Sequence, residues 1–80
     1  MLDYSESIRL TPDNVRAYNN RAYMFAQSHS YEKAIADYST VLNIDPSNAH
    51  AYNNRGLAFD KIGAFDQAIS DFTKVFTYIE

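Results

Sequence analysis

Apolar side chains recur along the chain at the spacing of amphipathic α-helices. Tyr18, Ala22 and Phe25 follow one another at steps of four and three residues, so they line one face of a helix. A second stripe with helical spacing consists of Tyr31, Ala34, Ile35, Tyr38, Val41 and Leu42. Together with the related pattern further along the chain, these stripes predict helices over residues 2–10, 15–28, 31–44, 49–62 and 65–78.

Short polar segments separate these helices and force each helix to run antiparallel to the next. Gly63 suits the left-handed turn that ends a helix. His29 stands at the corresponding place before the helix over 31–44, where the same conformation costs about 1–2 kcal/mol. Pro46 stops the helix over 31–44, and Asn48 is a good N-cap for the helix that follows. The pattern therefore predicts helical hairpins.

The hairpins are copies of one another, because the sequence repeats itself after 34 residues. Residues 17–22 read AYNNRA, and residues 51–56 read AYNNRG. The same shift relates five further identical pairs, namely Phe25 and Phe59, Ala34 and Ala68, Ile35 and Ile69, Asp37 and Asp71, and Val41 and Val75. We therefore divide the chain into residues 1–13, the second helix of a truncated unit, and two units over 14–47 and 48–80. A single hairpin cannot bury both of its stripes, so neighbouring hairpins must stack into an all-α solenoid.

These units resemble the tetratricopeptide repeat (TPR), a helix–turn–helix motif of 34 residues. The aromatic, small and proline positions of that family are matched in the first unit by Tyr18, Ala22, Phe25, Ala34, Tyr38 and Pro46. In the second unit they are matched by Tyr52, Gly56, Phe59, Ala68 and Phe72, with Glu80 in place of the proline. The resemblance spans nearly the whole chain, and it implies an α-solenoid with right-handed superhelical stacking.

Both units depart from the family at a position that is usually leucine, which is Arg21 in one and Arg55 in the other. An aspartate also recurs once per unit on the second helix, as Asp3, Asp37 and Asp71. We predict that the arginines lie in helix–helix contacts and pair with these aspartates, which would bury the aliphatic part of each arginine. The alternative is that the arginines contact a ligand directly.

Composition narrows the classes of function. The chain has 80 residues, a net charge of −3 and no cysteine, which excludes disulfides, zinc fingers and thiol catalysis. The negative charge argues against nucleic acid as a partner. No apolar run approaches the roughly 20 residues of a membrane helix. We therefore expect a soluble, cytoplasmic protein that binds neither nucleic acid nor membranes.

Nothing in the sequence forms a recognisable catalytic or metal site. His29 falls in a turn and His50 near the start of a helix, and there is no glycine-rich phosphate loop or other catalytic motif. Four tyrosines recur at core spacing, which favours packing over the stacking of nucleobases, namely Tyr18, Tyr31, Tyr38 and Tyr52. We expect a protein that is not an enzyme and needs no cofactor or metal.

The resemblance implies a concave groove lined by the first helix of each unit, which in this family commonly holds a peptide or a partner helix. The residues that project there are Arg16, Asn19, Asn20, Tyr23, Ala26 and Gln27, followed by His50, Asn53, Asn54, Leu57, Asp60 and Lys61. Side-chain amides suit an extended peptide, because they donate to its carbonyls and accept from its N–H groups at once. We therefore expect a protein-interaction module, with a merely solvated concave face as the alternative.

One subset of the family grips a C-terminal carboxylate with lysine, arginine and asparagine residues. Asn20 and Asn54 match one member of that clamp. Asn19 and Asn53 stand where its lysine is expected. Tyr23 and Leu57 stand where one of its asparagines is expected. We therefore do not predict that this chain binds chaperone tails.

The ends of the repeat array suggest a rival function, in which the chain is a structural spacer or a self-assembling unit without a groove ligand. We expect the chain to be part of a longer array, because it begins within a unit and ends without a capping helix. In the first unit the helix over 49–62 should cover the apolar side chains of the helix before it. Their counterparts in the second unit lack such a cover, so we expect self-association through Phe72, Val75, Phe76 and Ile79.

Overall fold

The computed structural model describes residues 15–78 of the chain, and in this range the regular structure is entirely helical. The helices are α2 (Val15–Gln27), α3 (Tyr31–Ile44), α4 (Ala49–Lys61) and α5 (Phe65–Tyr78). These bounds confirm the predicted ranges to within one residue at each end. The predicted helix over 2–10 lies outside the described residues.

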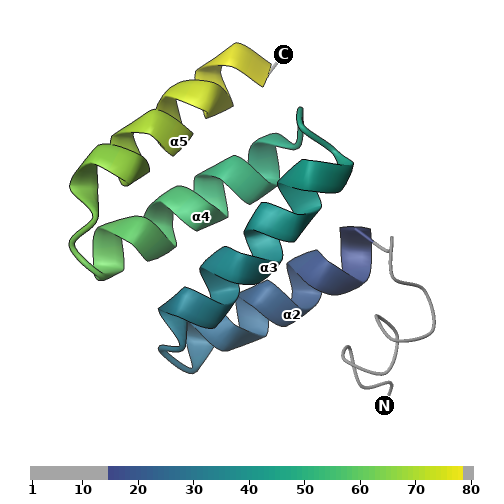
Figure 1. The fold of residues 1–80 in the computed structure, drawn as a ribbon, viewed down its shortest axis with the longest axis vertical. Coiled ribbons are helices and arrows are strands. Elements are labelled where there is room, and N and C mark those ends of the chain that lie inside the picture. Colours follow the sequence, from purple (N-terminus) through teal and green to yellow (C-terminus); the bar gives the residue numbers. More distant parts are fainter. Residues whose placement is uncertain (1–14, 79–80) are drawn as a thin grey trace.

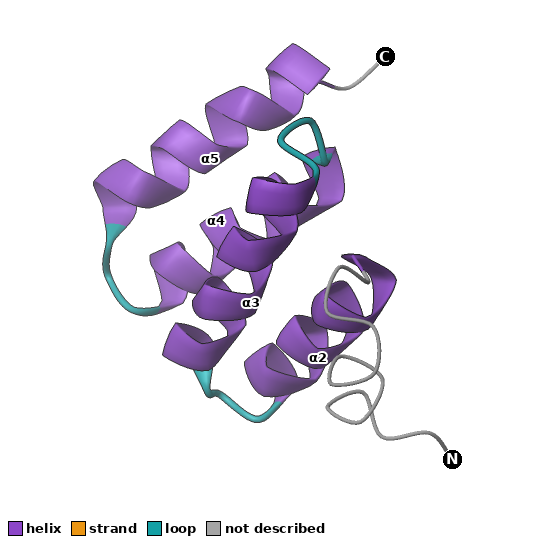
Figure 2. Ribbon diagram, turned by 45° about the vertical axis from the view of Figure 1, so that its right-hand side comes forward, coloured by secondary structure: helices purple, strands orange, loops and turns teal. Residues whose placement is uncertain are grey.

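The four helices form two hairpins that stack side by side (Figures 1 and 2). α2 packs against α3 in the first hairpin, and α4 packs against α5 in the second. α3 also packs against α4, whereas α2 and α4 touch only along a narrow strip. This arrangement confirms the predicted all-α solenoid, because each hairpin buries one of its faces against its neighbour.

The core lies where α2, α3 and α4 meet. Its buried residues are Ala22, Ala34, Tyr38, Val41, Leu42 and Ala51, with Tyr18, Phe25 and Tyr52 packed against them. Ala34 is fully buried, as its place in the apolar stripe predicts. The apolar face of α3 is buried in this cluster together with Ala51 of α4, as expected for a helix covered by the next hairpin.

Local backbone signals in the sequence explain where the helices begin and end. His29 has a φ of 64° and Gly63 a φ of 81°, so both turns use the left-handed conformation predicted for them. Asn48 caps α4, because its side-chain oxygen accepts a hydrogen bond of 3.0 Å from the N–H of Ala51. The first turn bears a steric cost of about 1–2 kcal/mol that the second avoids with glycine.

The exposed apolar surface of α5 differs from the prediction. Phe72 is half-buried because its ring packs on Gly56, where an added Cβ would lie 2.8 Å from Phe72 Cε1. Val75 is also half-buried, and Ile79 lies outside the described residues. Phe76 is 81% exposed, as predicted, and the other large exposed apolar side chains of α5 include Phe65 and Ile69. The expectation of one exposed face over Phe72, Val75 and Phe76 is therefore wrong for its first two members.

Candidate binding groove

Each of the two arginines that depart from the family pattern joins the two helices of its own hairpin. Nε and Nη2 of Arg21 donate to the two carboxylate oxygens of Asp37, both at 2.7 Å. Arg55 makes the same two-pronged contact with Asp71, at 2.8 and 2.7 Å. Both aspartates are buried. These contacts confirm the predicted pairing for Asp37 and Asp71, whereas Asp3 lies outside the described residues.

Each guanidinium group also lies against two aromatic rings of its own helix. The guanidinium carbon of Arg55 is 5.7 Å from the centre of the Tyr52 ring and 5.6 Å from that of Phe59. Its Nη1 donates a 3.1 Å hydrogen bond to the hydroxyl of Ser39 on α3. The hydrogen bonds to Asp71 raise the pKa of Arg55, so this side chain stays charged. We conclude that Arg55 is a structural residue joining α3, α4 and α5.

Most of the residues predicted to face the groove border hollows between or beside α2 and α4. Tyr23, Gln27, Asn54, Leu57 and Lys61 border a hollow near the α2–α3 turn, which we call the anchor hollow. Asn19, Asn20, Tyr23, Asn48, His50 and Asn54 border a second one near the start of α4, which we call the amide hollow. Asn53 and His50 border a third, together with Ala49 and Val75. Arg16 is exposed but is not among the residues of these hollows.

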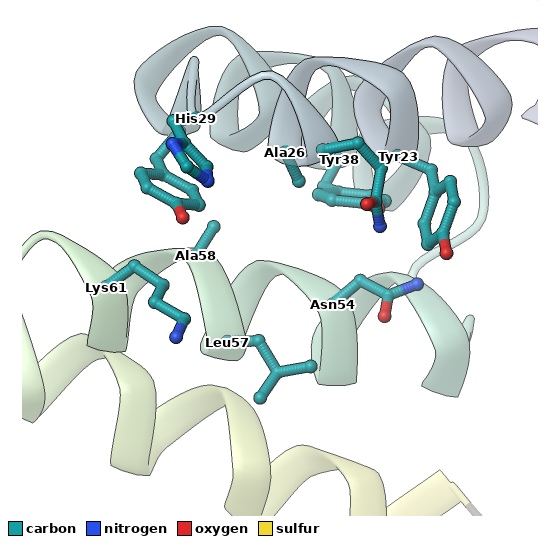
Figure 3. A pocket seen from close by; sticks show the side chains of 10 residues that line it. Tyr23, Ala26, His29, Tyr38, Asn54, Leu57, Ala58 and Lys61 are labelled. Atoms are coloured by element: carbon teal, nitrogen blue, oxygen red, sulfur yellow. The ribbon is translucent and has the colours of Figure 1, made fainter.

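The anchor hollow has a volume of about 290 Å³. Tyr23 and His29 from the first hairpin lie on one side of it, and Asn54, Leu57 and Lys61 of α4 lie on the other (Figure 3). The lining also includes Tyr38 and Ala58, which are 1% and 2% exposed. Buried residues and exposed rims together make a small depression that is lined by apolar and polar side chains from α2, α3, α4 and the α2–α3 turn.

Sequence reasoning missed four residues of the anchor hollow, namely His29, Tyr31, Tyr38 and Ala58. The prediction took only the outward positions of the two first helices, whereas the hollow reaches into the α2–α3 turn and onto α3. The left-handed conformation of a non-glycine residue at His29 was the available signal, because such strain often occurs at functional sites.

The amide hollow gathers hydrogen-bonding side chains from both hairpins. Asn19 and Asn20 come from α2, Asn54 comes from α4, and Asn48 stands just before α4. Within residues 15–78, the side-chain oxygen of Asn19 is buried and accepts no hydrogen bond. A buried acceptor without a partner is unfavourable by about 1–3 kcal/mol. If the Asn19 side chain turned toward this hollow, an N–H donor of a ligand would give that oxygen a partner.

The described part of the chain lacks two other features. Its histidine, aspartate and glutamate side chains nowhere gather in a group of three that could hold a metal ion. None of the helices α2 to α5 is long and apolar enough to span a membrane.

The chain is similar to several proteins of known structure. It aligns with MamA at 27% identity and a TM-score of 0.90, covering 94% of this chain but only 44% of MamA. The TPR domain of Arabidopsis OM64 is 30% identical with a TM-score of 0.92, over 95% of this chain and 63% of that one. The second TPR domain of Spaghetti (RPAP3), bound to the HSP90 peptide SRMEEVD, is 28% identical with a TM-score of 0.91, over 94% and 69%.

Sequence comparisons place the chain in a family. Curated proteins gave no significant match. Profiles described as tetratricopeptide repeats match residues 4–36 and residues 49–80. A third profile, described as a TPR repeat, matches residues 22–63 and thus more than half of the chain. The repeat period, the stacked hairpins and these matches agree, and the chain belongs to the tetratricopeptide repeat family.

Proposed function

We propose that this chain is a protein-interaction module whose concave groove binds an extended peptide segment of a protein partner. The observation that carries the proposal is the amide hollow, where asparagine side chains from both hairpins converge. Asn20 and Asn54 are half-buried there, so part of each residue remains accessible to a ligand. An amide both donates and accepts, and it can therefore pair with a peptide group in either direction.

The comparison with Spaghetti supports the same use of the groove, since that related domain is bound to a peptide. The present chain lacks the lysine that a carboxylate clamp needs, because Asn19 and Asn53 stand at the corresponding positions. We therefore propose recognition of a peptide backbone within a segment, without a requirement for a free C-terminus.

The test compares affinity capture from a cell lysate by the wild type and by the double variant Asn20→Ala with Asn54→Ala. A partner captured by the wild type is then titrated against both proteins by calorimetry. Loss of two hydrogen-bonding amides should weaken binding by roughly 1–3 kcal/mol, or about 5- to 150-fold. Asn43→Ala, an exposed asparagine of α3 outside the groove, is the matched control. Equal affinity of the double variant and the wild type would contradict the groove assignment.

A second function, self-association, is favoured by the exposed apolar side chains of α5. Phe65, Ile69 and Phe76 are 59%, 63% and 81% exposed and follow one another at helical spacing. They present on the order of 400 Å² of apolar surface. Two such surfaces facing each other would bury roughly 800 Å², less than the ~1,200 Å² typical of stable complexes. We therefore expect a weak dimer of the chain, formed through α5.

Light scattering coupled to size exclusion should detect this dimer at tens of micromolar protein. The double variant Ile69→Glu with Phe76→Glu should be monomeric at the same concentration. The control places the same charges at Ser70 and Thr77, which are exposed on α5 beside the apolar stripe. A monomeric wild type at every concentration would contradict self-association and leave α5 to contacts with a different chain or segment.

A further inference from the structure

We infer that the anchor hollow binds one bulky apolar side chain of the peptide together with a neighbouring acidic residue, and that His29 contacts the first and Lys61 the second. The inference rests on the proposed function, since it names the kind of segment that the groove would take. It concerns the side chains of that segment, whereas the amide hollow concerns its backbone.

The backbone at His29 is the first reason. The α2–α3 turn and the α4–α5 turn have the same left-handed geometry, but only the second uses glycine. At Gly63 an added Cβ would meet nothing within 4 Å, so the space around that turn would admit a side chain. A turn that is easier to form with glycine nevertheless carries an imidazole in the first hairpin. The His29 ring stacks on Tyr31 at 5.8 Å between ring centres and borders the anchor hollow.

The second reason is the size of the anchor hollow and the apolar surface that Tyr23 and Leu57 present at it. Tyr23 lines it from α2 and Leu57 lines it from α4 (Figure 3), and the two residues remain 53% and 48% exposed. Pockets for drug-sized molecules usually have volumes of ~300–1,000 Å³. With about 290 Å³, this hollow is at the lower limit and suits one large side chain rather than a whole small molecule. A phenylalanine, leucine or methionine side chain would cover Tyr23 and Leu57 at once.

The third reason is charge. Lys61 borders the anchor hollow from the last turn of α4, and none of the residues that line this hollow is acidic. The tyrosine rings alone could attract a cation. The ammonium group of Lys61 would repel one, and it complements a carboxylate instead. An aspartate or glutamate next to the apolar anchor residue of the peptide therefore fits this side of the groove.

The test uses four short peptides that differ only at the two proposed positions, which are Phe-Asp, Ser-Asp, Phe-Lys and Ser-Lys within a glycine–serine sequence. All four are acetylated and amidated, so that no terminal carboxylate contributes. Each is titrated into the isotope-labelled chain and followed by chemical shifts in heteronuclear NMR spectra. The Phe-Asp peptide should bind at least about fivefold more tightly than the others. Its largest shifts should fall at residues 27–31 and 54–61.

Variants of the chain assign the two preferences to residues. His29→Gly and His29→Asn should both weaken binding of the Phe-Asp peptide by about three- to tenfold, although His29→Gly should raise the melting temperature. Lys61→Gln should remove the preference for Asp over Lys in the peptide. Lys74→Gln, which removes an exposed lysine on α5 outside the hollow, is the control and should change neither preference.

The outcomes separate this inference from the proposed function. Four peptides that bind the groove equally would overturn the anchor hollow and leave peptide binding intact. If no peptide binds up to millimolar concentration, the inference is also overturned. The proposed function is then tested separately, by titrating the captured partner against the wild type and the asparagine variant. Unchanged binding of the Phe-Asp peptide by both His29 variants would overturn the contact between His29 and the apolar side chain.

Discussion

The ion pair between Arg55 and Asp71 joins the two helices of the second hairpin, and a substitution at Asp71 tests how much this pair stabilises the fold. We predict that Asp71→Asn lowers the free energy of unfolding substantially although it hardly changes the shape of the side chain. The substitution removes the negative charge from a site that is 3% exposed. It also turns one of the two acceptors of Arg55 into an N–H₂ group, which faces a donor.

The magnitude follows from the burial of the pair. Removing one partner of a fully buried pair costs about 3–5 kcal/mol, because it leaves an uncompensated charge. The side chain of Arg55 is still 20% exposed and donates to Ser39 as well, so water and that hydroxyl compensate in part. We therefore expect a loss of roughly 2–3 kcal/mol. A chain of this size has a total stability of only about 4–12 kcal/mol, so the loss is large.

Urea unfolding followed by far-ultraviolet circular dichroism measures this loss. Asp66→Asn is the control, because Asp66 is exposed in the first turn of the same helix and should contribute less than about 1 kcal/mol. The double variant Arg55→Met with Asp71→Leu should be less destabilised than the sum of the two single changes, since it leaves no unpaired charge. An Asp71→Asn variant as stable as the wild type would refute the reasoning.

Three further predictions test the core, a helix cap and a buried hydroxyl. Ala34→Leu should overpack the fully buried α2–α3 contact and cost about 1–3 kcal/mol in urea unfolding, and an unchanged midpoint would show that the helices do not meet closely there. Asn48→Ala should cost about 1 kcal/mol in the same measurement because the N–H of Ala51 loses its acceptor, whereas Asn48→Asp should retain most of the stability. Burial raises the pKa of Tyr38 to about 12, whereas a tyrosine in the unfolded chain ionises near 10. The unfolded state therefore loses its proton first, and stability that is fully present below about pH 10 falls as the pH rises toward 12. Thermal melts across this range should show a smaller fall for Tyr38→Phe, and an identical fall would contradict the raised pKa.

The helices and the salt bridges could be predicted because local signals and the repeat specify them. Periodicity and turn residues such as Gly63 and Pro46 place the helix ends without any knowledge of the tertiary contacts. The arginine and the aspartate return together after one period, which indicates a structural pair better than a ligand site. The bond from Arg55 to Ser39 was not predictable, because it depends on how closely the second hairpin stacks on the first.

The residues that line the two hollows were predictable only in part. The positions of Tyr23, Leu57 and the asparagines follow from the phase of the first helices. His29 and Tyr31 also line the anchor hollow, and their positions there depend on the path of the α2–α3 turn. The burial of Phe72 was missed because Gly56 lets its ring approach α4 more closely than a larger residue would.

Because of the hydrogen bond between Arg55 and Ser39, the segment that is stable as a unit is longer than the segment that repeats in the sequence. The repeat divides the chain at the loop between α3 and α4, but this side chain bridges that boundary while it grips Asp71 on α5. Cutting the loop would therefore not release two self-sufficient halves. A substitution that removes the carboxylate of Asp71 on α5 would also affect the first hairpin, because the guanidinium group of Arg55 would remain unpaired against α3. Such a chain should melt as one body, and insertions should be tolerated better in the turns within hairpins than in the loop between them.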